Sequence, residues 1–329
     1  MKAWLIAAIF AAGVAHAQNS QGPSQNPALQ WKLATGYRAE SFHTQNLVQF
    51  AQDVGEATGG QLKIEVHPNN TLFKLNDIRA AVQDGKVEAG ETIMSSLVKD
   101  MPIAGADSVP FVVTSYADAQ RLWQLQRPLI DKHFAERGLK VLYAVPWPPQ
   151  GLFSAKPIRG SADFAGTKMR TYNQTTVRIA ELMKAVPVDV PMVEVSKALA
   201  ESRMDNMITS AVTGVENQVW GPIRNYYEIN AWFPKNIVFV NARKFAALKP
   251  AVQKAVLDAA SKAETRGWAK SQQVMVDATN ELRAHGIKVE RVSAEFEQEI
   301  KRLGEKFSRE WVRLVGNEAN AIFVPYYTQ

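Results

Sequence analysis

The chain has 329 residues, a formal net charge of +6 and no cysteine. The absence of cysteine excludes disulfide bonds, thiolate catalysis, cysteine-ligated zinc and a lipid-modified cysteine anchor. The length exceeds what one hydrophobic core usually holds, so two domains are expected. Lysine and arginine alternate with acidic residues along the last two predicted helices, which is typical of a solvated face, and no nucleic-acid partner is expected.

The N-terminus has the pattern of a secretory signal peptide. Lys2 supplies one positive charge, residues 3–14 form a short apolar run, and Ala15-His16-Ala17 ends it with small residues. Residues 1–17 are therefore predicted to be cleaved off after Ala17, and residues 18–30 to form a flexible leader. An exported protein without a lipid anchor would diffuse away unless an outer membrane retained it, so we expect a periplasmic location.

Strands and helices alternate in the first half of the remaining chain, which favours a largely parallel sheet. The predicted elements are a strand at 31–35, a helix capped by Thr44 and ended by Gly59-Gly60, a strand at 61–66, a helix at 75–83, a strand at 87–93, and helices at 118–125 and 128–137.

A proline-rich crossing follows a strongly apolar segment. Residues 139–145 are predicted to be a central strand that is buried on both faces. They run into Pro146-Trp147-Pro148-Pro149-Gln150, where three prolines hold a tryptophan in a fixed place. This segment marks the first expected domain boundary.

The main candidate binding residue is Arg170. Residues 163–166 read as a turn and 168–172 as a short strand, after which Asn173 can cap a helix. Arg170 thus lies at a strand end, the edge where open α/β sheets bind ligands. Its guanidinium offers a planar fork of donors that fits a carboxylate, close to helix-terminal amides that also favour an anion. A surface arginine in an ion pair is the alternative interpretation.

The second half of the chain predicts a return to the first domain and a long connecting helix. Its elements are an edge strand at 186–190, a helix at 194–201, a segment at 204–210, a strand at 236–241, a helix at 251–285 with a kink point at Gly267, a strand at 287–292 and an amphipathic helix at 294–315. The expected fold class is α/β, with two lobes that each hold a mixed sheet, a hinged cleft, and a long helix spanning both lobes. The first lobe is predicted to comprise residues 31–149 plus 236–276, and the second 150–235 plus 277–329.

The sequence favours binding over catalysis. It has no HExxH, no G-x-S-x-G and no Walker loop, and an exported hydrolase or isomerase would depend on His43 at the cleft edge. The strand ends instead combine an anion anchor, hydrogen-bonding side chains and aromatic surface, which a small organic acid requires. For each candidate except Arg170, packing or capping is an equal alternative. The candidates are Phe42, His43, Met94, Ser95, Trp147, Gln150, Arg170, Tyr172, Asn173, Thr209, Ser210 and Asn236.

Several segments, in their order and spacing, resemble one known family. From about Trp31 to the end of the final helix, the chain resembles the periplasmic solute-binding proteins of tripartite ATP-independent (TRAP) transporters, of the dicarboxylate-binding-protein (DctP) type. No single motif is highly specific. The segments that carry the resemblance are Gly59-Gly60-Gln-Leu-Lys-Ile-Glu-Val66, Val109-Pro110-Phe111, residues 163–170, and Glu194-Val-Ser-Lys-Ala-Leu199 followed by Met204-Asp205.

The resemblance implies a function and a ligand class. The family's G-x-K-x-R arginine, which binds the substrate carboxylate, matches Arg170. The family's Asp-Gly-x-Glu-Asn-Pro segment reads Asp205-Asn-Met-Ile-Thr-Ser210 here. A second arginine, found in some members just after the buried strand, is missing, because this chain has Trp147-Pro-Pro-Gln150 there. These departures argue against a sugar acid, so we expect a monocarboxylate with an apolar or aromatic body.

The resemblance also implies a mechanism. The lobes would close on the acid and deliver it to integral-membrane permease subunits, without a cofactor or metal, and we expect a monomer. A ligand-binding subunit of a signalling system has the same fold and site and remains an alternative.

Overall fold

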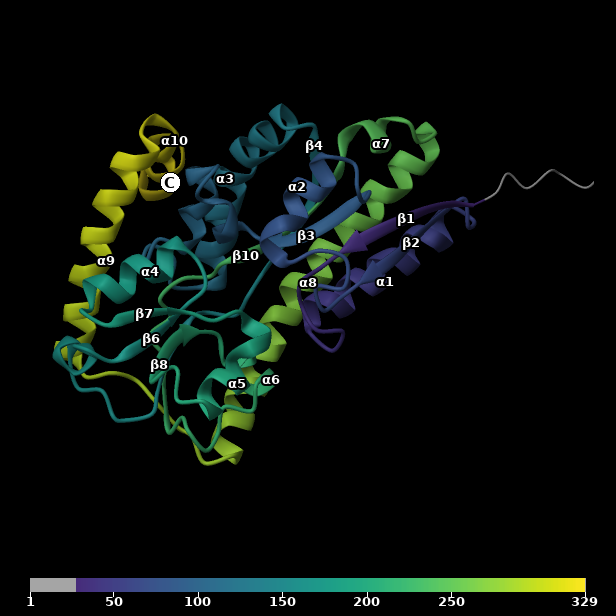
Figure 1. Cartoon of the computed structure of the whole chain (residues 1–329). Helices are drawn as coiled ribbons and strands as arrows, with labels where there is room; N and C mark the ends of the chain where they lie inside the picture. The colour runs from purple at the N-terminus through teal and green to yellow at the C-terminus, as the bar shows by residue number, and fades with distance from the viewer. Residues whose placement is uncertain (1–27, 329) are drawn as a thin grey trace, which may run out of the picture.

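The computed structural model describes residues 28–328 as an α/β protein with two β-sheets (Figure 1). The signal peptide predicted at 1–17, and the predicted leader as far as residue 27, lie outside the described residues. Strand β1 begins at Leu29, so the last residues assigned to the leader belong to a strand.

The first sheet has the strand order β2-β1-β3-β10-β4. Its middle strand β3 pairs in parallel with β1 and antiparallel with β10, which makes the sheet mixed. The predicted return of the chain is confirmed, because β10 is inserted between β3 and β4. The expectation of a central strand at 139–145 is wrong: β4 is an edge strand, and it is buried because α3 and α8 cover it. The strands are β1 (Leu29–Ala34), β2 (Leu62–His67), β3 (Ala89–Ile93), β4 (Leu139–Pro146) and β10 (Lys235–Asn241).

The second sheet has the order β11-β9-β5-β8-β6-β7. Strand β7 lies at its edge, as its internal Pro187 predicted. Strands β5 and β9 were not predicted, because runs of four and three residues are too short to show a periodicity. The strands are β5 (Gly151–Ser154), β6 (Lys168–Thr171), β7 (Val186–Asp189), β8 (Asn206–Thr209), β9 (Asn225–Tyr227) and β11 (Lys288–Glu290).

Helices cover both sheets. They are α1 (Phe42–Ala57), α2 (Ile78–Gln83), α3 (Tyr116–Glu136), α4 (Gln174–Leu182), α5 (Val195–Ala200), α6 (Ala211–Glu216), α7 (Ala242–Ala246), α8 (Pro250–Ala284), α9 (Ala294–Val315) and α10 (Asn317–Thr328). The two helices expected at 118–125 and 128–137 are the single helix α3. Pro128 lies inside it, and Leu122, Ile130 and Phe134 are buried on both sides of that proline. Helix α10 was not predicted.

The chain crosses between the sheets in two segments that lie side by side. One joins β4 to β5 and the other leads into β10. The backbone N–H of Trp147 donates to the Pro234 carbonyl at 2.8 Å, and the backbone N–H of Gln150 donates to the Trp232 carbonyl at 3.0 Å. These bonds couple the two crossings. The residue boundaries given for the two lobes stay a prediction.

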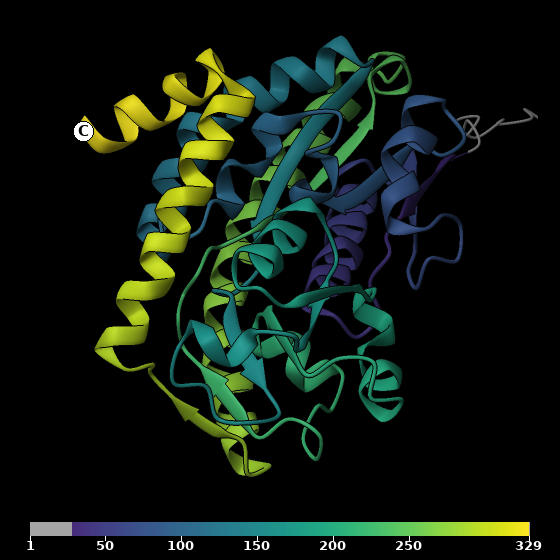
Figure 2. The same cartoon turned by 60° about the vertical axis from the view of Figure 1, so that its left-hand side comes forward.

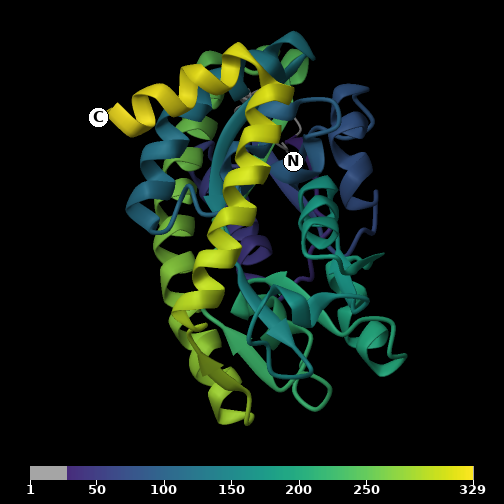
Figure 3. The same cartoon turned by 90° about the vertical axis from the view of Figure 1, so that its left-hand side faces the viewer.

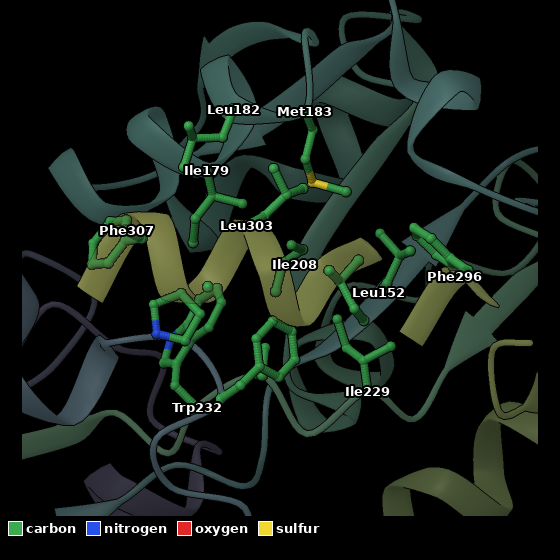
Figure 4. A pocket seen from close by; sticks show the side chains of 15 residues that line it. Leu152, Ile179, Leu182, Met183, Ile208, Ile229, Trp232, Phe296, Leu303 and Phe307 are labelled. Atoms are coloured by element: carbon green, nitrogen blue, oxygen red, sulfur yellow. The ribbon is translucent and has the colours of Figure 1, made fainter. Parts of the chain in front are cut away.

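The amphipathic helix α9 packs its apolar side on α4 and on the second sheet (Figure 4). Phe296, Leu303 and Phe307 of α9 line a gap of about 30 Å³ together with Ile179 and Leu182 of α4. The gap is lined almost entirely by apolar side chains and is far too small for an organic solute, so it is a packing defect of the core.

Helix α8 runs past both sheets along the length of the molecule (Figures 2 and 3). It packs against α1 and β4 of the first sheet, and against α6 and β11 of the second. Gly267 lets α8 approach β4 closely, because a Cβ atom there would lie 2.4 Å from Cγ2 of Val145.

We expect Gly267→Ala to lower the free energy of unfolding by roughly 1–3 kcal/mol, because the added methyl overpacks the contact with Val145. Gly55→Ala in α1 is the matched control, since a Cβ there meets nothing within 4 Å. That control should be stabilising by about 0.5–1 kcal/mol. Urea denaturation of both variants tests this, and equal shifts would show that the close approach of α8 does not matter.

Candidate ligand-binding site

A cavity of about 410 Å³ lies between the two sheets. Its volume falls in the range of small-molecule sites, roughly 300–1,000 Å³. The first-sheet side contributes two aromatic rings together with Asn70, Lys74 and Asn76, and the second-sheet side contributes mostly polar and charged residues, including Asp189 and Glu194. Among the lining residues are Gly36, Tyr37, Ile93 and Trp147 on one side, and Gln150, Arg170, Tyr172, Thr209, Ser210 and Thr213 on the other.

Strand ends bring the polar lining residues together. Strands β6 and β8 are parallel and end at Thr171 and Thr209, so their last residues share one edge of the sheet. Strand β5 is antiparallel to β8, with Gly151 opposite Thr209, which puts the preceding Gln150 at the same edge. The predicted placement of Arg170 at this edge is what the structure shows.

Arg170 is buried, with 3% of its surface exposed. Its Nε donates to the Val190 carbonyl at 2.9 Å, and its guanidinium carbon lies 4.7 Å from the centre of the Tyr172 ring. Among residues 28–328, no carboxylate forms an ion pair with it, so the alternative of a surface ion pair is wrong.

The electrostatics of Arg170 favour an anion. Burial lowers its pKa to about 10, which still leaves the guanidinium charged at neutral pH. A buried charge without a counter-ion is costly, and an anionic ligand relieves that cost. The guanidinium in this cavity is therefore suited to a carboxylate.

Most of the polar groups around Arg170 are neutral, although the Asp189 carboxylate also lines the cavity and acts on the guanidinium electrostatically. The Gln150 side-chain amide donates to the Pro148 carbonyl at 2.9 Å, and its Oε1 lies 3.5 Å from the Tyr172 hydroxyl. Burial raises the pKa of Tyr172 to about 12, so this hydroxyl is a neutral donor. Thr209 and Ser210 also line the cavity, and Ser210 caps α6. These side chains can hydrogen-bond a ligand without adding charge.

Two aromatic rings form the opposite wall. Trp147 was predicted there, whereas Tyr37 was missed; their ring centres lie 5.3 Å apart. Tyr37 follows the first predicted strand by two residues, so the strand-end argument used for the other candidates would have found it.

Phe42, His43 and Met94 do not line the cavity. The rings of His43 and Phe42 pack against Trp147, with centres 4.3 and 5.5 Å away, and Phe42 lines a separate groove between α1, α6 and α8. Met94 follows β3 and points into the hydrophobic core. The strand-end argument placed these residues near the site but not on the correct side of their elements.

His43 is poorly placed for catalysis. It is buried, and burial lowers its pKa well below the usual value, so the imidazole is neutral. Its Nδ1 lies 3.6 Å from the Glu91 carboxylate, and neither ring nitrogen forms a hydrogen bond within the described part of the chain. The residue on which the enzyme alternative depended does not face the cavity.

The other three candidates, Ser95, Asn173 and Asn236, do not line the cavity but form hydrogen bonds next to it. The Asn173 amide donates to the Ser95 hydroxyl at 2.7 Å, which links α4 of the second sheet to the turn after β3 of the first. Asn236 is fully buried in β10, where its side-chain oxygen accepts hydrogen bonds from Tyr37 and Trp147.

The described residues offer no metal centre and no membrane span. Within 28–328, no group of three or more His, Cys, Asp or Glu side chains is placed to hold a metal ion. No helix in that range combines the length and apolar character needed to cross a bilayer.

Two sheets joined by paired crossings, a helix along both, and a cavity between them that is lined by a buried guanidinium are the features of a solute receptor. The chain belongs to the bacterial extracellular solute-binding proteins of family 7, the DctP family, which matches residues 33–313. This confirms the predicted resemblance to the TRAP solute-binding proteins.

Solved structures and curated proteins agree with this assignment. DctP6 of Bordetella pertussis, an extracytoplasmic solute receptor binding pyroglutamic acid, is 35% identical with a TM-score of 0.89, covering 91% of this chain and all of that one. A marine metagenome TRAP protein specific for pyroglutamate is also 35% identical, with a TM-score of 0.89, covering 92% and 99% of the two chains. The 2,3-diketo-L-gulonate-binding periplasmic protein YiaO of Escherichia coli is 26% identical over 83% of this chain and 84% of its own length.

Proposed function

We propose that this protein captures a small monocarboxylic acid in the periplasm and delivers it to the membrane subunits of a TRAP transporter. The observation that carries the proposal is the buried Arg170 guanidinium, which faces the cavity without a carboxylate partner from the described chain. Its charge and its fork of donors suit a carboxylate, and the rest of the cavity lining is mostly aromatic or neutral.

Pyroglutamate is the acid that the observations favour. Structures 35% identical to this chain are receptors for it. It has one carboxylate, one lactam N–H, one lactam carbonyl and a compact ring with apolar faces. The cavity offers one guanidinium for the carboxylate, the side chains of Gln150 and Thr209 for the lactam, and the rings of Tyr37 and Trp147 for the apolar faces.

We further propose that the protein acts as a monomer, binds no nucleic acid and performs no chemistry on its ligand. The position of His43 away from the cavity supports the last point. A role as the ligand-binding subunit of a signalling system would use the same site, and a neighbouring pair of permease genes would favour transport.

A thermal-unfolding screen tests the ligand. The purified chain is heated with pyroglutamate, orotate, D-glucuronate or L-gulonate. An acid present at one hundred times its dissociation constant should add about 2.7 kcal/mol of stability. We expect a clear shift with pyroglutamate and little with the two sugar acids. No shift with any of the four acids, or an equal shift with D-glucuronate, would contradict the proposal.

Closure of the lobes should depend on Arg38, which follows β1 of the first sheet. Its Nη2 donates to the Val193 carbonyl at 3.1 Å and to the Asn217 side chain at 3.3 Å, and its Nη1 donates to the Glu216 carbonyl. All three acceptors belong to segments that pack with the second sheet, so the hydrogen bonds of Arg38 link the two lobes. It does not line the cavity.

We expect Arg38→Met to weaken ligand binding by about 1–3 kcal/mol, because hydrogen bonds to a charged group that hold the closed form are lost. The loss should appear as faster dissociation in stopped-flow measurements, with the preference among acids unchanged. Arg79→Met is the control, since Arg79 pairs with Asp100 within the first lobe. Identical dissociation rates for wild type and Arg38→Met would show that the hydrogen bonds of Arg38 do not hold the lobes closed.

A further inference from the structure

One amide oxygen holds both polar atoms of the aromatic wall. The side-chain Oδ1 of Asn236 accepts a hydrogen bond from the Tyr37 hydroxyl at 3.1 Å and from the Trp147 indole N–H at 2.8 Å. Asn236 is 0% exposed and lies in β10, where it pairs with Ile93 on one side and Val145 on the other. Neighbouring strands on both sides therefore fix the position of this oxygen.

The two bonds determine what the wall offers a ligand. A carbonyl oxygen has two lone pairs, and here both are used. The indole N–H is the only side-chain donor of Trp147 and is already bonded to Asn236, so this ring meets the cavity as apolar surface. The Tyr37 hydroxyl has one hydrogen, which it gives to Asn236, so it cannot donate to a ligand.

Packing behind the wall keeps the rings in this orientation. Phe42 meets Trp147 edge-on at 82°, and the His43 ring lies 4.3 Å from it at 49°. Because these neighbours are buried, Trp147 cannot turn its N–H into the cavity without losing both contacts and the bond to Asn236.

Part of the cavity is therefore without donors. The polar groups of Arg170, Gln150 and Thr209 come from the second sheet, and Asn70, Lys74 and Asn76 line the first-sheet side elsewhere, whereas the wall formed by the rings of Tyr37 and Trp147 gives no hydrogen. A flat ring with polar groups on one edge finds partners for all of them. An acid with hydroxyls on all sides leaves some of them against ring faces without an acceptor or donor, which disfavours its binding.

We propose that Asn236 is a positioning residue that sets ligand specificity: by holding Tyr37 and Trp147 with one oxygen, it keeps one wall of the cavity apolar and selects flat cyclic acids over polyhydroxylated ones. The inference rests on the proposed function as a carboxylate receptor. It assigns selectivity to a residue that does not touch the ligand.

The test compares the dissociation constants for D-glucuronate and pyroglutamate in the wild type and in Asn236→Leu, by calorimetry. Leucine has a similar size and no acceptor, so the hydrogen of the Tyr37 hydroxyl is freed and can be donated to a ligand in the cavity. We expect the ratio, the D-glucuronate constant divided by the pyroglutamate constant, to fall at least tenfold. Adding Tyr37→Phe removes the freed hydroxyl, and the double variant should regain part of the ratio.

Asn241→Leu is the matched control. Asn241 lies on the same strand and is also buried, but its side chain bonds the Val82 carbonyl far from the cavity. It should leave the ratio unchanged. If the wild type binds pyroglutamate and Asn236→Leu weakens both acids equally, the inference is overturned while the proposed function stands. If the wild type binds no carboxylate, the proposed function itself fails.

A measurement on the wild type covers the case in which Asn236→Leu does not fold. The Trp147 indole N–H signal, assigned by its loss in Trp147→Phe, should exchange slowly with solvent both with and without pyroglutamate. Rapid exchange of this proton would mean that it is not held by Asn236 and would overturn the inference.

Discussion

Replacing Arg170 with glutamine is expected to weaken carboxylate binding by about 2–5 kcal/mol, because a buried charge-assisted partner is lost. The fold should persist, since the Arg170 side chain makes one hydrogen bond within residues 28–328, to the Val190 carbonyl. Arg170→Lys should also bind weakly, because lysine keeps the charge but lacks the planar fork. Calorimetry with pyroglutamate measures both variants.

Arg178→Gln serves as the control for this experiment. Arg178 lies on the helix after the same strand, but it is far more exposed and pairs with Glu310 and Glu181. It should bind pyroglutamate with the affinity of the wild type. If Arg170→Gln and Arg178→Gln behaved alike, Arg170 would not be the carboxylate anchor.

Replacing Asp107 with asparagine is expected to cost about 3–5 kcal/mol of stability. Asp107 and Lys235 are both 0% exposed, with Lys235 Nζ 3.3 Å from Asp107 Oδ2, and the same oxygen accepts the Lys235 backbone N–H at 2.8 Å. Lys235 opens β10 at one of the two crossings between sheets. The variant leaves a buried ammonium without its counter-ion at the point where the chain changes sheet.

Two further variants separate the unpaired charge from lost packing. Asp258→Asn removes an exposed pair with Lys254 and should change stability by less than about 1 kcal/mol. The double variant Asp107→Leu/Lys235→Met removes both buried charges and should recover much of the loss. Urea denaturation measures all three. A loss below 1 kcal/mol in Asp107→Asn would mean that water reaches the pair.

The fold could be predicted where elements are long or strongly patterned. The 35-residue α8, the amphipathic α9 and the return strand β10 all carry clear local signals. Strands β5 and β9 are too short for such a signal. The edge position of β4 depends on which strands pair, and no local pattern in an apolar segment reveals its neighbours.

The site could be predicted where a residue ends a strand of the second sheet. Gln150, Arg170, Tyr172, Thr209 and Ser210 all line the cavity, and their contact with a ligand stays a prediction. The same argument gave wrong predictions for residues next to β3 and α1, because the sequence does not show which side of an element faces the cleft. The position of Asn236 depends on pairing between strands that are distant in sequence.

A crystal structure of the purified protein grown with pyroglutamate tests the central claim most directly. We expect the acid between the two sheets, with its carboxylate on the Arg170 guanidinium and its ring against Tyr37 and Trp147. Pyroglutamate bound elsewhere, or a ligand in this cavity whose carboxylate avoids Arg170, would contradict it.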